Sequence, residues 1–392
     1  MKKLKTSCIA ISAVLAVTLS TSVVAGCGRS YDIYTNIPQG QYEITDKEYA
    51  LAQTIDGYTT AQKGEETFPD TSGYTPMSYS FFFMTTDATL FLYEDFTAEG
   101  ATAKFENFKK AVSSTLDKID KAISTGVENS DIKRFNRMPA GELLEISKIT
   151  YEVLQEAKHV YEWTGGYYNP ALYYNVQAYG FGSGNSYPKT NEELPSDEVI
   201  AKYTDLSTHF GEIVLEESNG RYFVVKPEYT VEVEGETLSL KLDLGGIGKG
   251  YAVDKVDELF DDYGYRFGYF NFGSSSMLVK YYDSNTPFTI GLSGPRTPSR
   301  DPYVKIPIAN EKLSTSGDNE QNYTIDGKRY CHIIDPKTGK PIETGIMSAT
   351  VIGGSACTDD ALTTALLAMG KDRAVEFIQN ELKDRKVVFV CE

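Results

Sequence analysis

Apolar side chains recur at every third or fourth position in one stretch of the chain and predict an amphipathic helix. The stretch contains Phe105, Phe108, Val112, Leu116, Ile119 and Ile123. This spacing places all of them on one helical face. Further helices are predicted over about residues 143–164, ended by a pair of glycines, over residues 251–263, and from residue 359 to residue 368.

Short runs of β-branched and aromatic residues predict the strands. Residues 212–225 hold two such runs around Asn219-Gly220, which is a strong signal for a hairpin turn. Other strands are expected at residues 80–93, 229–244, 265–272, 288–292, 303–308, 348–352 and 386–391. Hairpins mixed with crossover helices favour one large α+β domain, over residues 76–392, with a mixed sheet system.

The N-terminal pattern is that of an export signal. Lys2, Lys3 and Lys5 precede an apolar run rich in small residues, from position 9 to 24. The run ends in Val24-Ala25-Gly26-Cys27, which resembles a bacterial lipobox, so residues 1–26 are predicted to be removed and Cys27 to carry lipid. An ordinary signal peptide or a short membrane anchor is the alternative. Polar, weakly periodic residues 27–75 are predicted to tether the domain to the outer face of the cytoplasmic membrane, or within the periplasm.

Composition narrows the classes of ligand. The chain has 38 Lys and Arg against 55 Asp and Glu, a net charge of −17, which disfavours nucleic-acid binding. An anionic substrate would need a local cationic site. Cys331, Cys357 and Cys391 remain after export and form no CxxC pair or Cys/His cluster, so a structural zinc site is not expected.

The most informative segment is Asp243-Leu244-Gly245-Gly246-Ile247-Gly248-Lys249-Gly250, where a strand passes through four glycines and one lysine into a helix. Such a turn lets the backbone approach a ligand and favours anions at the helix N-terminus. Lys249 adds a charge for a phosphate. The spacing matches neither a Walker A loop nor a dinucleotide fingerprint. A tight turn without a ligand is the alternative interpretation.

Two further segments carry candidate chemistry. Asp360 and Thr364 lie one turn apart on the last predicted helix, so a carboxylate and a hydroxyl share a face that suits Mg²⁺. The alternative is that Asp359 or Asp360 only caps this helix. His332 ends a predicted strand before the turn at residues 335–339, and it could accept a hydroxyl proton, although a lone histidine is more often a packing residue.

Together these segments resemble the ApbE family of FAD:protein FMN transferases. Five shorter blocks add to the resemblance in the family's order: residues 83–86, 130–136, 164–170, 271–273 and 314–318. The resemblance covers about residues 81–390 and implies an ApbE-like, T-fold-like domain. It also implies Mg²⁺-dependent transfer of FMN from FAD to a Thr or Ser hydroxyl of an exported protein, with release of AMP. Family members are commonly exported lipoproteins, which agrees with Cys27.

The resemblance implies roles for individual residues. His332 matches the catalytic base, and Gly246, Asp360 and Thr364 match the metal site. Flavin-nucleotide contacts are implied for Met84, Tyr167, Tyr168, Asn169, Asp243, Lys249 and Ile334.

Some positions depart from the family pattern. Asn169 stands where an aspartate is usual, Thr85 replaces a glycine, and Gly126 replaces an aromatic residue. Residues 273–275 replace a Gly-Gly-Asn-like turn. All lie where flavin or adenine would pack, so FAD affinity can differ. Two alternatives stay open: hydrolysis of FAD to FMN and AMP, and FAD binding without catalysis.

Overall fold

The computed structural model describes residues 32–37, 41, 43–44, 51–54, 71, 74–182, 185–281, 287–296 and 302–392. The predicted signal, Cys27 and most of the predicted tether lie outside these ranges. Within them, no helix combines the length and the apolar character that crossing a bilayer requires.

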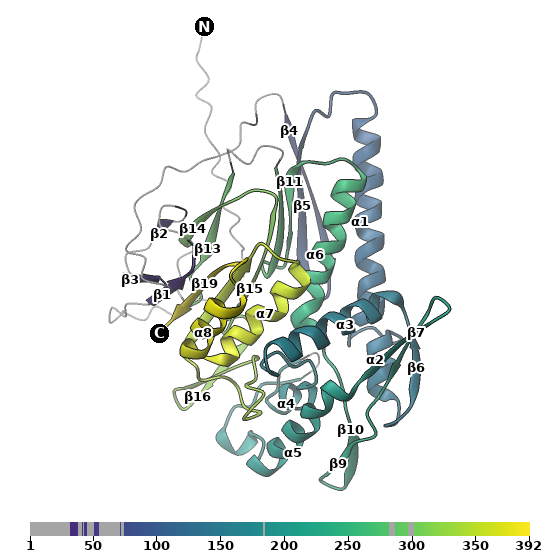
Figure 1. The fold of residues 1–392 in the computed structure, drawn as a ribbon, viewed down its shortest axis with the longest axis vertical. Helices are drawn as coiled ribbons and strands as arrows, with labels where there is room; N and C mark the ends of the chain where they lie inside the picture. Colours follow the sequence, from purple (N-terminus) through teal and green to yellow (C-terminus); the bar gives the residue numbers. More distant parts are fainter. Residues whose placement is uncertain are drawn as a thin grey trace.

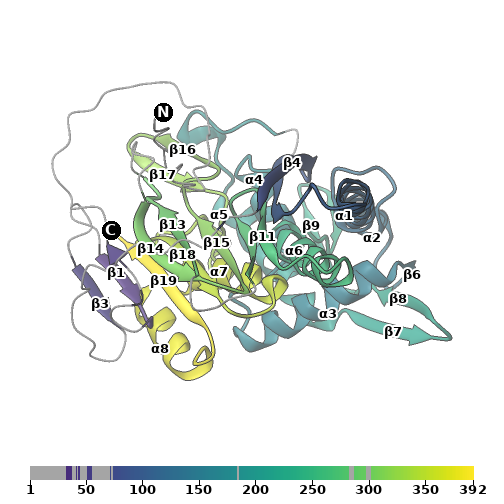
Figure 2. The same ribbon diagram turned by 90° about the horizontal axis from the view of Figure 1, so that it is seen from above.

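A nine-stranded sheet forms the centre of the fold (Figures 1 and 2). Its strands in spatial order are β3 (Leu51–Thr54), β1 (Asp32–Thr35), β19 (Lys386–Cys391), β18 (Ile346–Ile352), β15 (Glu311–Gly317), β12 (Ser276–Tyr281), β11 (Phe267–Phe272), β5 (Thr86–Glu94) and β4 (Thr75–Phe83). Neighbouring strands are antiparallel, except that β1 and β3 run parallel.

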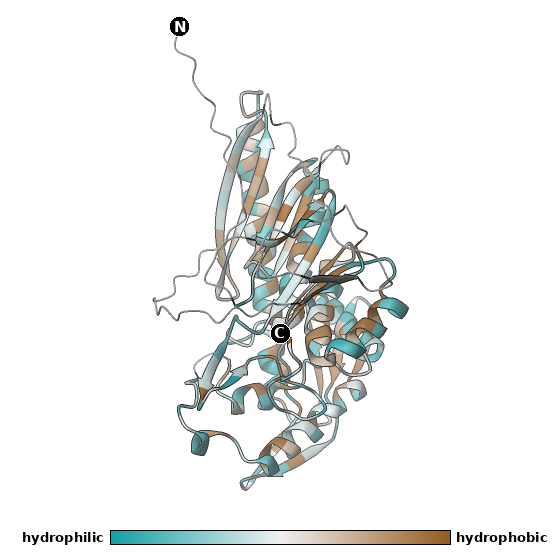
Figure 3. Ribbon diagram, turned by 90° about the vertical axis from the view of Figure 1, so that its left-hand side faces the viewer, coloured by the Kyte–Doolittle hydropathy of each residue, from teal (hydrophilic) through white to brown (hydrophobic). Residues whose placement is uncertain are grey.

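The sheet is buried on both faces around β18 and β19, whereas its edge strand β4 is largely exposed. In β19, Val387 and Phe389 belong to the core under the helices, whereas Val388 and Val390 belong to a second core on the opposite face. This division follows from the two-residue period of a strand. Figure 3 shows long hydrophobic stretches along the strands of the large sheet. The opposite face is covered by a small sheet of β13 (Phe288–Ser293), β14 (Pro302–Ile308) and β2 (Glu43–Ile44).

Three helices lie against the other face of the sheet: α1 (Ala101–Ile123), α6 (Gly245–Asp262) and α7 (Ala356–Met369) (Figure 1). Helix α3 (Lys148–Trp163) packs across α6 and α7. Helix α7 is buried along most of its length, because it lies between the sheet and α6. The contact between α6 and α7 brings the candidate chemical segments together.

Smaller elements surround this core. They are α2 (Asp131–Arg137), α4 (Tyr173–Ala178), α5 (Asp197–Thr208), α8 (Lys371–Glu381), the short 3₁₀ helices at Asn191–Glu193 and His209–Glu212, the strands β6 (Leu143–Ile146), β8 (Arg221–Val225) and β7 (Val214–Ser218), and the hairpins β9 (Thr230–Val233) with β10 (Glu236–Ser239) and β16 (Asn322–Ile325) with β17 (Lys328–Cys331).

The predicted α+β class, the amphipathic helix α1 and the hairpin at Asn219-Gly220 are confirmed. Several boundaries differ. Residues 143–146 form a strand, and α3 starts only after Ser147, whose Oγ accepts a hydrogen bond from the backbone N–H of Thr150. Residues 80–93 span a hairpin with its turn at Met84 and Thr85, which have φ of 47° and 61°. Helix α6 starts at Gly245, and α8 follows α7.

The predicted tether is wrong for the short strands β1, β2 and β3, which pair within the two sheets. In β1, Ile33 and Tyr34 are buried on opposite faces, and the ring of Tyr34 stacks on that of Phe389 with centroids 4.9 Å apart. The Thr35 hydroxyl donates to the carbonyl oxygen of Val387 at 2.7 Å. Because the surrounding residues are polar, the sequence pattern did not indicate that Asp32–Thr35 forms a strand of the large sheet.

Candidate active site

Helix α6 begins within the glycine-rich segment. The Asp243 carboxylate accepts a hydrogen bond from the Gly245 N–H at 2.9 Å, and the Asp243 N–H donates to the Pro170 carbonyl oxygen at 2.8 Å. Gly246 departs from helical geometry, with φ −87° and ψ 15°. The glycines were interpreted as a turn before the helix, but they form its first turns.

Gly250 has a packing role that no other residue could fill. A Cβ at this position would lie 2.0 Å from the carbonyl oxygen of Ala356 and 2.8 Å from the Cβ of Asp360. Only glycine lets α6 and α7 approach so closely. This approach places Asp360 directly against the backbone of α6.

Asp360 does not cap α7. The N-cap is Ser355, whose Oγ accepts from the Thr358 N–H. Asp359 also has another role, since its carboxylate accepts from the Gly354 N–H at 2.9 Å and forms an ion pair with Arg385 at 3.1 Å. The capping interpretation is therefore wrong for both aspartates.

The Asp360 carboxylate is buried, with 1% of the residue exposed. Its Oδ2 accepts a hydrogen bond from the Gly250 N–H at 3.1 Å, and its Oδ1 lies 3.5 Å from the Ser275 hydroxyl. Burial raises the pKa of this carboxyl, and the charge of Lys249 opposes the rise. No Lys or Arg in the described part of the chain lies within 4.0 Å of this carboxylate. Within the described ranges, it is a buried acid without an ion-pair partner.

Thr364 and Gly246 lie next to Asp360. The Thr364 hydroxyl oxygen is 3.5 Å from the place where a Cβ on Gly246 would stand, and it is also 3.5 Å from the Ser316 hydroxyl. The structure thus brings the three predicted metal-site residues to one face of the α6–α7 contact. Among the described residues, no group of three or more His, Cys, Asp and Glu side chains forms an alternative site for a metal ion.

His332 follows β17, as predicted. Its backbone N–H donates to the Gln321 carbonyl oxygen at 3.0 Å, and its buried Nδ1 has no hydrogen-bond partner among the described residues. Burial lowers the pKa of the imidazole to about 4, and the nearby positive charge of Lys249 contributes to this fall. The imidazole is therefore neutral at physiological pH, with one nitrogen free.

The predicted flavin-contact residues divide into two groups. Met84 and Tyr168 lie at the glycine-rich segment: the Met84 Cε is 3.0 Å from the position of a Cβ on Gly248, and a Tyr168 ring carbon is 3.8 Å from that of a Cβ on Gly246. The buried Tyr168 hydroxyl has no hydrogen-bond partner in the described ranges, and burial raises its pKa strongly.

The other residues have structural partners. The Asn169 side chain accepts from the Ala171 N–H at 2.9 Å and donates to the Ser207 carbonyl oxygen at 3.1 Å. Ile334 is buried in an apolar cluster that also contains Phe181 and Tyr330. The ring of Tyr167 has two cations near it, Lys337 and Arg373, each 5.2 Å from the ring centroid.

The ApbE family model matches residues 84–389. The chain belongs to the ApbE family. Its relatives include the FAD:protein FMN transferases of Vibrio cholerae, 29% identical over 66% of this chain and 72% of that protein, and of Escherichia coli K12, 25% identical over 70% and 74%. The ApbE protein of Thermotoga maritima has a similar solved structure, with a TM-score of 0.66 and 27% identity over 80% of this chain and 94% of that one. The apo flavinyl transferase ApbE of Pseudomonas stutzeri has a TM-score of 0.64 over 81% and 92%, at 23% identity.

The resemblance to the ApbE family drawn from the motifs is therefore confirmed. The motifs did not reveal Glu320, whose pKa is raised by desolvation of its carboxyl, while the positive charge of Lys249 opposes the rise. Its negative charge in turn raises the pKa of Asp360. Asp254 was also not recognised as a site residue, and Ser275 was noted only as part of a turn that departs from the family pattern, without a contact to Asp360. These three come close to α7 only through tertiary packing, so no local pattern marks them.

Proposed function

We propose that the protein transfers FMN from FAD to a Thr or Ser hydroxyl of an exported acceptor protein. The hydroxyl oxygen forms a bond to the phosphorus of the FMN half, the pyrophosphate bond breaks, and AMP leaves. The observation that carries this proposal is the grouping of Gly246, Asp360 and Thr364 at one face of the α6–α7 contact. The names of the relatives, FAD:protein FMN transferase, support it.

The residues present fit a hard divalent cation. Asp360 supplies a buried carboxylate without a cationic partner among the described residues, Thr364 supplies a hydroxyl, and Gly246 supplies a backbone carbonyl. Oxygen ligands of this kind suit Mg²⁺, which usually completes its shell with water and substrate phosphate. When bound, Mg²⁺ would neutralise charge on the pyrophosphate.

Lys249 and His332 supply the other chemistry. Lys249 reaches back along α6, with its Nζ 3.1 Å from the Gly245 carbonyl oxygen, and its charge acts on both Asp360 and His332. A cation here would hold a pyrophosphate oxygen. His332 is neutral, and its Nδ1 has no partner in the described part of the chain, so it would accept the proton of the incoming hydroxyl.

We also propose that Cys27 carries lipid that anchors the protein to the outer face of the cytoplasmic membrane or within the periplasm. The support is the sequence of residues 24–27 after an apolar run. Two or three acyl chains, at about 0.8 kcal/mol per buried CH₂, suffice for stable attachment. Mass spectrometry of the mature N-terminus tests this, and an unmodified or uncleaved Cys27 would contradict it.

The decisive experiment incubates the mature protein with FAD and Mg²⁺, with and without an exported flavoprotein subunit. AMP release and the mass of the acceptor are measured together. Transfer predicts an acceptor heavier by one FMN, with AMP formed in equal amount. AMP and free FMN formed without acceptor would instead identify a hydrolase, and FAD that stays intact in both reactions would identify a binding protein.

A further inference from the structure

Helices α6 and α7 run in opposite directions and meet at every fourth residue. The contacts pair Gly246 with Thr364, Gly250 with Asp360, and Asp254 with Ala356. The first two of these pairs contain the candidate metal site. The third pair lies about one helical turn further along α6, where Asp254 follows Gly246 and Gly250 at the same four-residue spacing.

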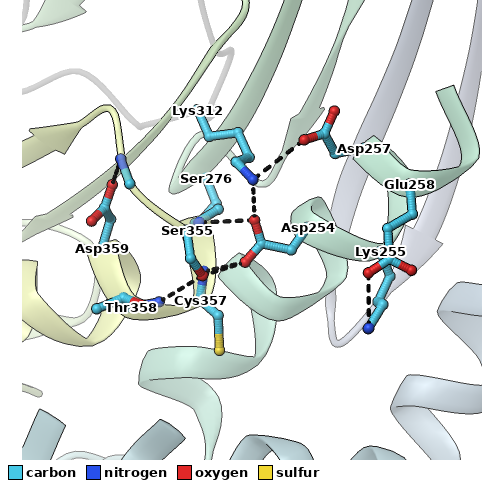
Figure 4. A network of polar contacts seen from close by, with 12 residues as sticks. Asp254, Lys255, Asp257, Glu258, Ser276, Lys312, Ser355, Cys357, Thr358 and Asp359 are labelled. Atoms are coloured by element: carbon cyan, nitrogen blue, oxygen red, sulfur yellow. Dashed lines mark hydrogen bonds and ion pairs between the residues drawn. The ribbon is translucent and has the colours of Figure 1, made fainter. Parts of the chain in front are cut away.

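In the third pair, both carboxylate oxygens of Asp254 accept hydrogen bonds from the N-terminus of α7 (Figure 4). Its Oδ1 accepts from the Ala356 N–H at 2.9 Å, and its Oδ2 accepts from the Cys357 N–H at 2.9 Å and from the Ser355 hydroxyl at 2.6 Å. The first N–H groups of a helix have no partner within the helix, and a negative charge there is favoured by the helix dipole. A side chain of α6 thus holds the N-terminus of α7.

Asp254 is itself held from the sheet. The Lys312 ammonium on β15 lies 2.7 Å from Asp254 Oδ1 and 3.3 Å from Asp257 Oδ2 (Figure 4). The Lys280 ammonium on β12 lies 2.5 Å from Asp257 Oδ1. These ion pairs restrain the rotamer of Asp254 and join α6, α7 and two strands in one network. The carboxylate cannot turn away from α7 without losing its 2.7 Å ion pair with Lys312.

The position of Asp360 depends on where α7 starts. Asp360 lies four residues after Ala356, and at 1.5 Å per residue this is about 6 Å along a rigid helix. A shift or rotation of the first turn is therefore passed on to Asp360, while Gly246 stays with α6. Because oxygen ligands for one cation must come from both helices, such a shift changes their separation directly.

We propose that Asp254 is a positioning residue for the metal site: by fixing the first turn of α7 against α6, it sets the separation of Asp360 and Thr364 from the Gly246 carbonyl. The inference rests on the proposed function, since that proposal places the metal between these residues. Under this proposal, Asp254 itself contacts neither the metal ion nor FAD nor the acceptor protein.

The test compares the mature wild-type protein with Asp254→Asn and Asp254→Ala. Asn keeps the shape but loses one acceptor and the charge, whereas Ala loses the whole contact. The control is Asp257→Asn, which removes a carboxylate from the same helix and from the same lysine without touching α7. The Kd for Mg²⁺ is measured by calorimetry, and the melting temperature is measured without metal. The Mg²⁺ concentration that half-saturates transfer and kcat at saturating Mg²⁺ are also measured.

We expect the Kd for Mg²⁺ to rise about 10-fold or more in Asp254→Ala and less in Asp254→Asn, as for other residues that orient metal ligands. The half-saturating Mg²⁺ concentration should rise in parallel, with kcat largely recovered at high Mg²⁺, and Asp257→Asn should stay within about twofold of wild type. A merely structural role would lower the melting temperature of the Asp254 variants and leave the Kd unchanged, which would overturn the inference.

Two other outcomes also decide it. If Asp254→Ala does not fold, the folded Asp254→Asn variant must still bind Mg²⁺ more weakly than Asp257→Asn does, and an equal Kd would contradict the inference. If the wild-type protein itself binds no Mg²⁺, the proposed metal site fails. The inference then fails with it, for a reason that the wild-type measurement alone identifies.

Discussion

Asp254 on α6 and Asp360 on α7 form reciprocal contacts, since each carboxylate accepts hydrogen bonds from the backbone of the opposite helix. Their electrostatic surroundings differ. Asp254 has the ammonium of Lys312 at 2.7 Å, whereas Asp360 has no ion pair among the described residues and its pKa is raised by burial. The second carboxylate is therefore the one with capacity for a metal ion.

Asp360→Asn should abolish Mg²⁺ binding without destabilising the metal-free protein. The amide can still accept from the Gly250 N–H and can donate to the Ser275 hydroxyl, while the cost of burying a charge disappears. The check is a thermal melt with and without Mg²⁺: the metal-free melting temperature should equal or exceed that of wild type, and the Mg²⁺-induced rise should vanish. A rise that persists in the variant would refute the metal assignment.

The same carboxyl gives a pH signature. Its folded pKa lies above the ordinary value of 3.8, so the folded metal-free protein binds this proton more tightly than the unfolded chain does. The free energy of unfolding therefore falls as pH rises from 3.8 through the raised pKa. The advantage of Asp360→Asn over wild type should accordingly shrink in acid, and a gap that is independent of pH would contradict the burial argument.

His332→Ala should reduce transfer far more than FAD binding, because the imidazole is proposed to accept a proton and not to hold the flavin. The measurement is the rate of AMP release against the Kd for FAD. Equal losses in both would remove the proposed role of base. His332→Gln, which keeps a polar side chain but cannot act as the base, should behave like Ala.

The pKa of His332 also predicts how acid acts on the protein. Its folded pKa of about 4 lies below the ordinary value of 6.5, so the unfolded chain takes up this proton first as pH falls. The His332 contribution to stability is intact above pH 6.5 and decreases between pH 6.5 and about 4, by roughly 1–2 kcal/mol for a partly exposed group. Wild type should lose more stability than His332→Gln across this window in denaturant titrations, and parallel curves would contradict the assignment.

Gly250→Ala should be among the most damaging single-methyl additions in the chain. The new Cβ would fall 2.0 Å from the Ala356 carbonyl oxygen and force α6 away from α7. We expect a loss of about 3 kcal/mol in the free energy of unfolding, together with weaker Mg²⁺ binding. Gly126→Ala serves as the control, because its Cβ would meet only the Ser124 hydroxyl at 3.5 Å. Comparable losses in the two variants would show that the helix contact is not the cause.

Asn169→Asp, the change toward the residue usual in the family, should destabilise this protein. The Asn169 amide donates to the Ser207 carbonyl oxygen at 3.1 Å, and a carboxylate there would face that oxygen without a proton. The expected cost is about 1–3 kcal/mol at neutral pH, and it should diminish in acid, where the carboxyl is protonated and can donate again. Unchanged stability at neutral pH would show that the Ser207 contact contributes little.

Local patterns predicted much of the fold. The spacing of apolar residues in α1 and the Asn219-Gly220 turn are local properties, and both elements were found where expected. Strand β15 was missed because its centre is the polar run at residues 314–316, whose hydroxyls find partners only in the folded protein: Ser314 bonds to Ser276, and Thr315 to Thr350. Its burial in the middle of the sheet has no local signal.

The motifs proposed which residues form the candidate site, but they did not indicate how these residues are brought together. The residues that carry a charge or hydroxyl were identified from motifs, including Asp360, Thr364 and His332. What could not be predicted is the register of α6 on α7, which decides that Gly250 faces Asp360 and that Asp254 reaches Ala356. Register depends on the packing of helices more than 90 residues apart in the chain, and single-helix patterns do not contain it.

Strand β19 comes last in sequence among the described strands, yet it lies inside the large sheet, third from the edge formed by β3 and between β18 and β1. Until residues 386–391 have been synthesised, β18 lacks one neighbour and β1 has no place in the sheet. The large sheet therefore cannot form as one continuous sheet before residues 386–391 are available to join β1 to β18.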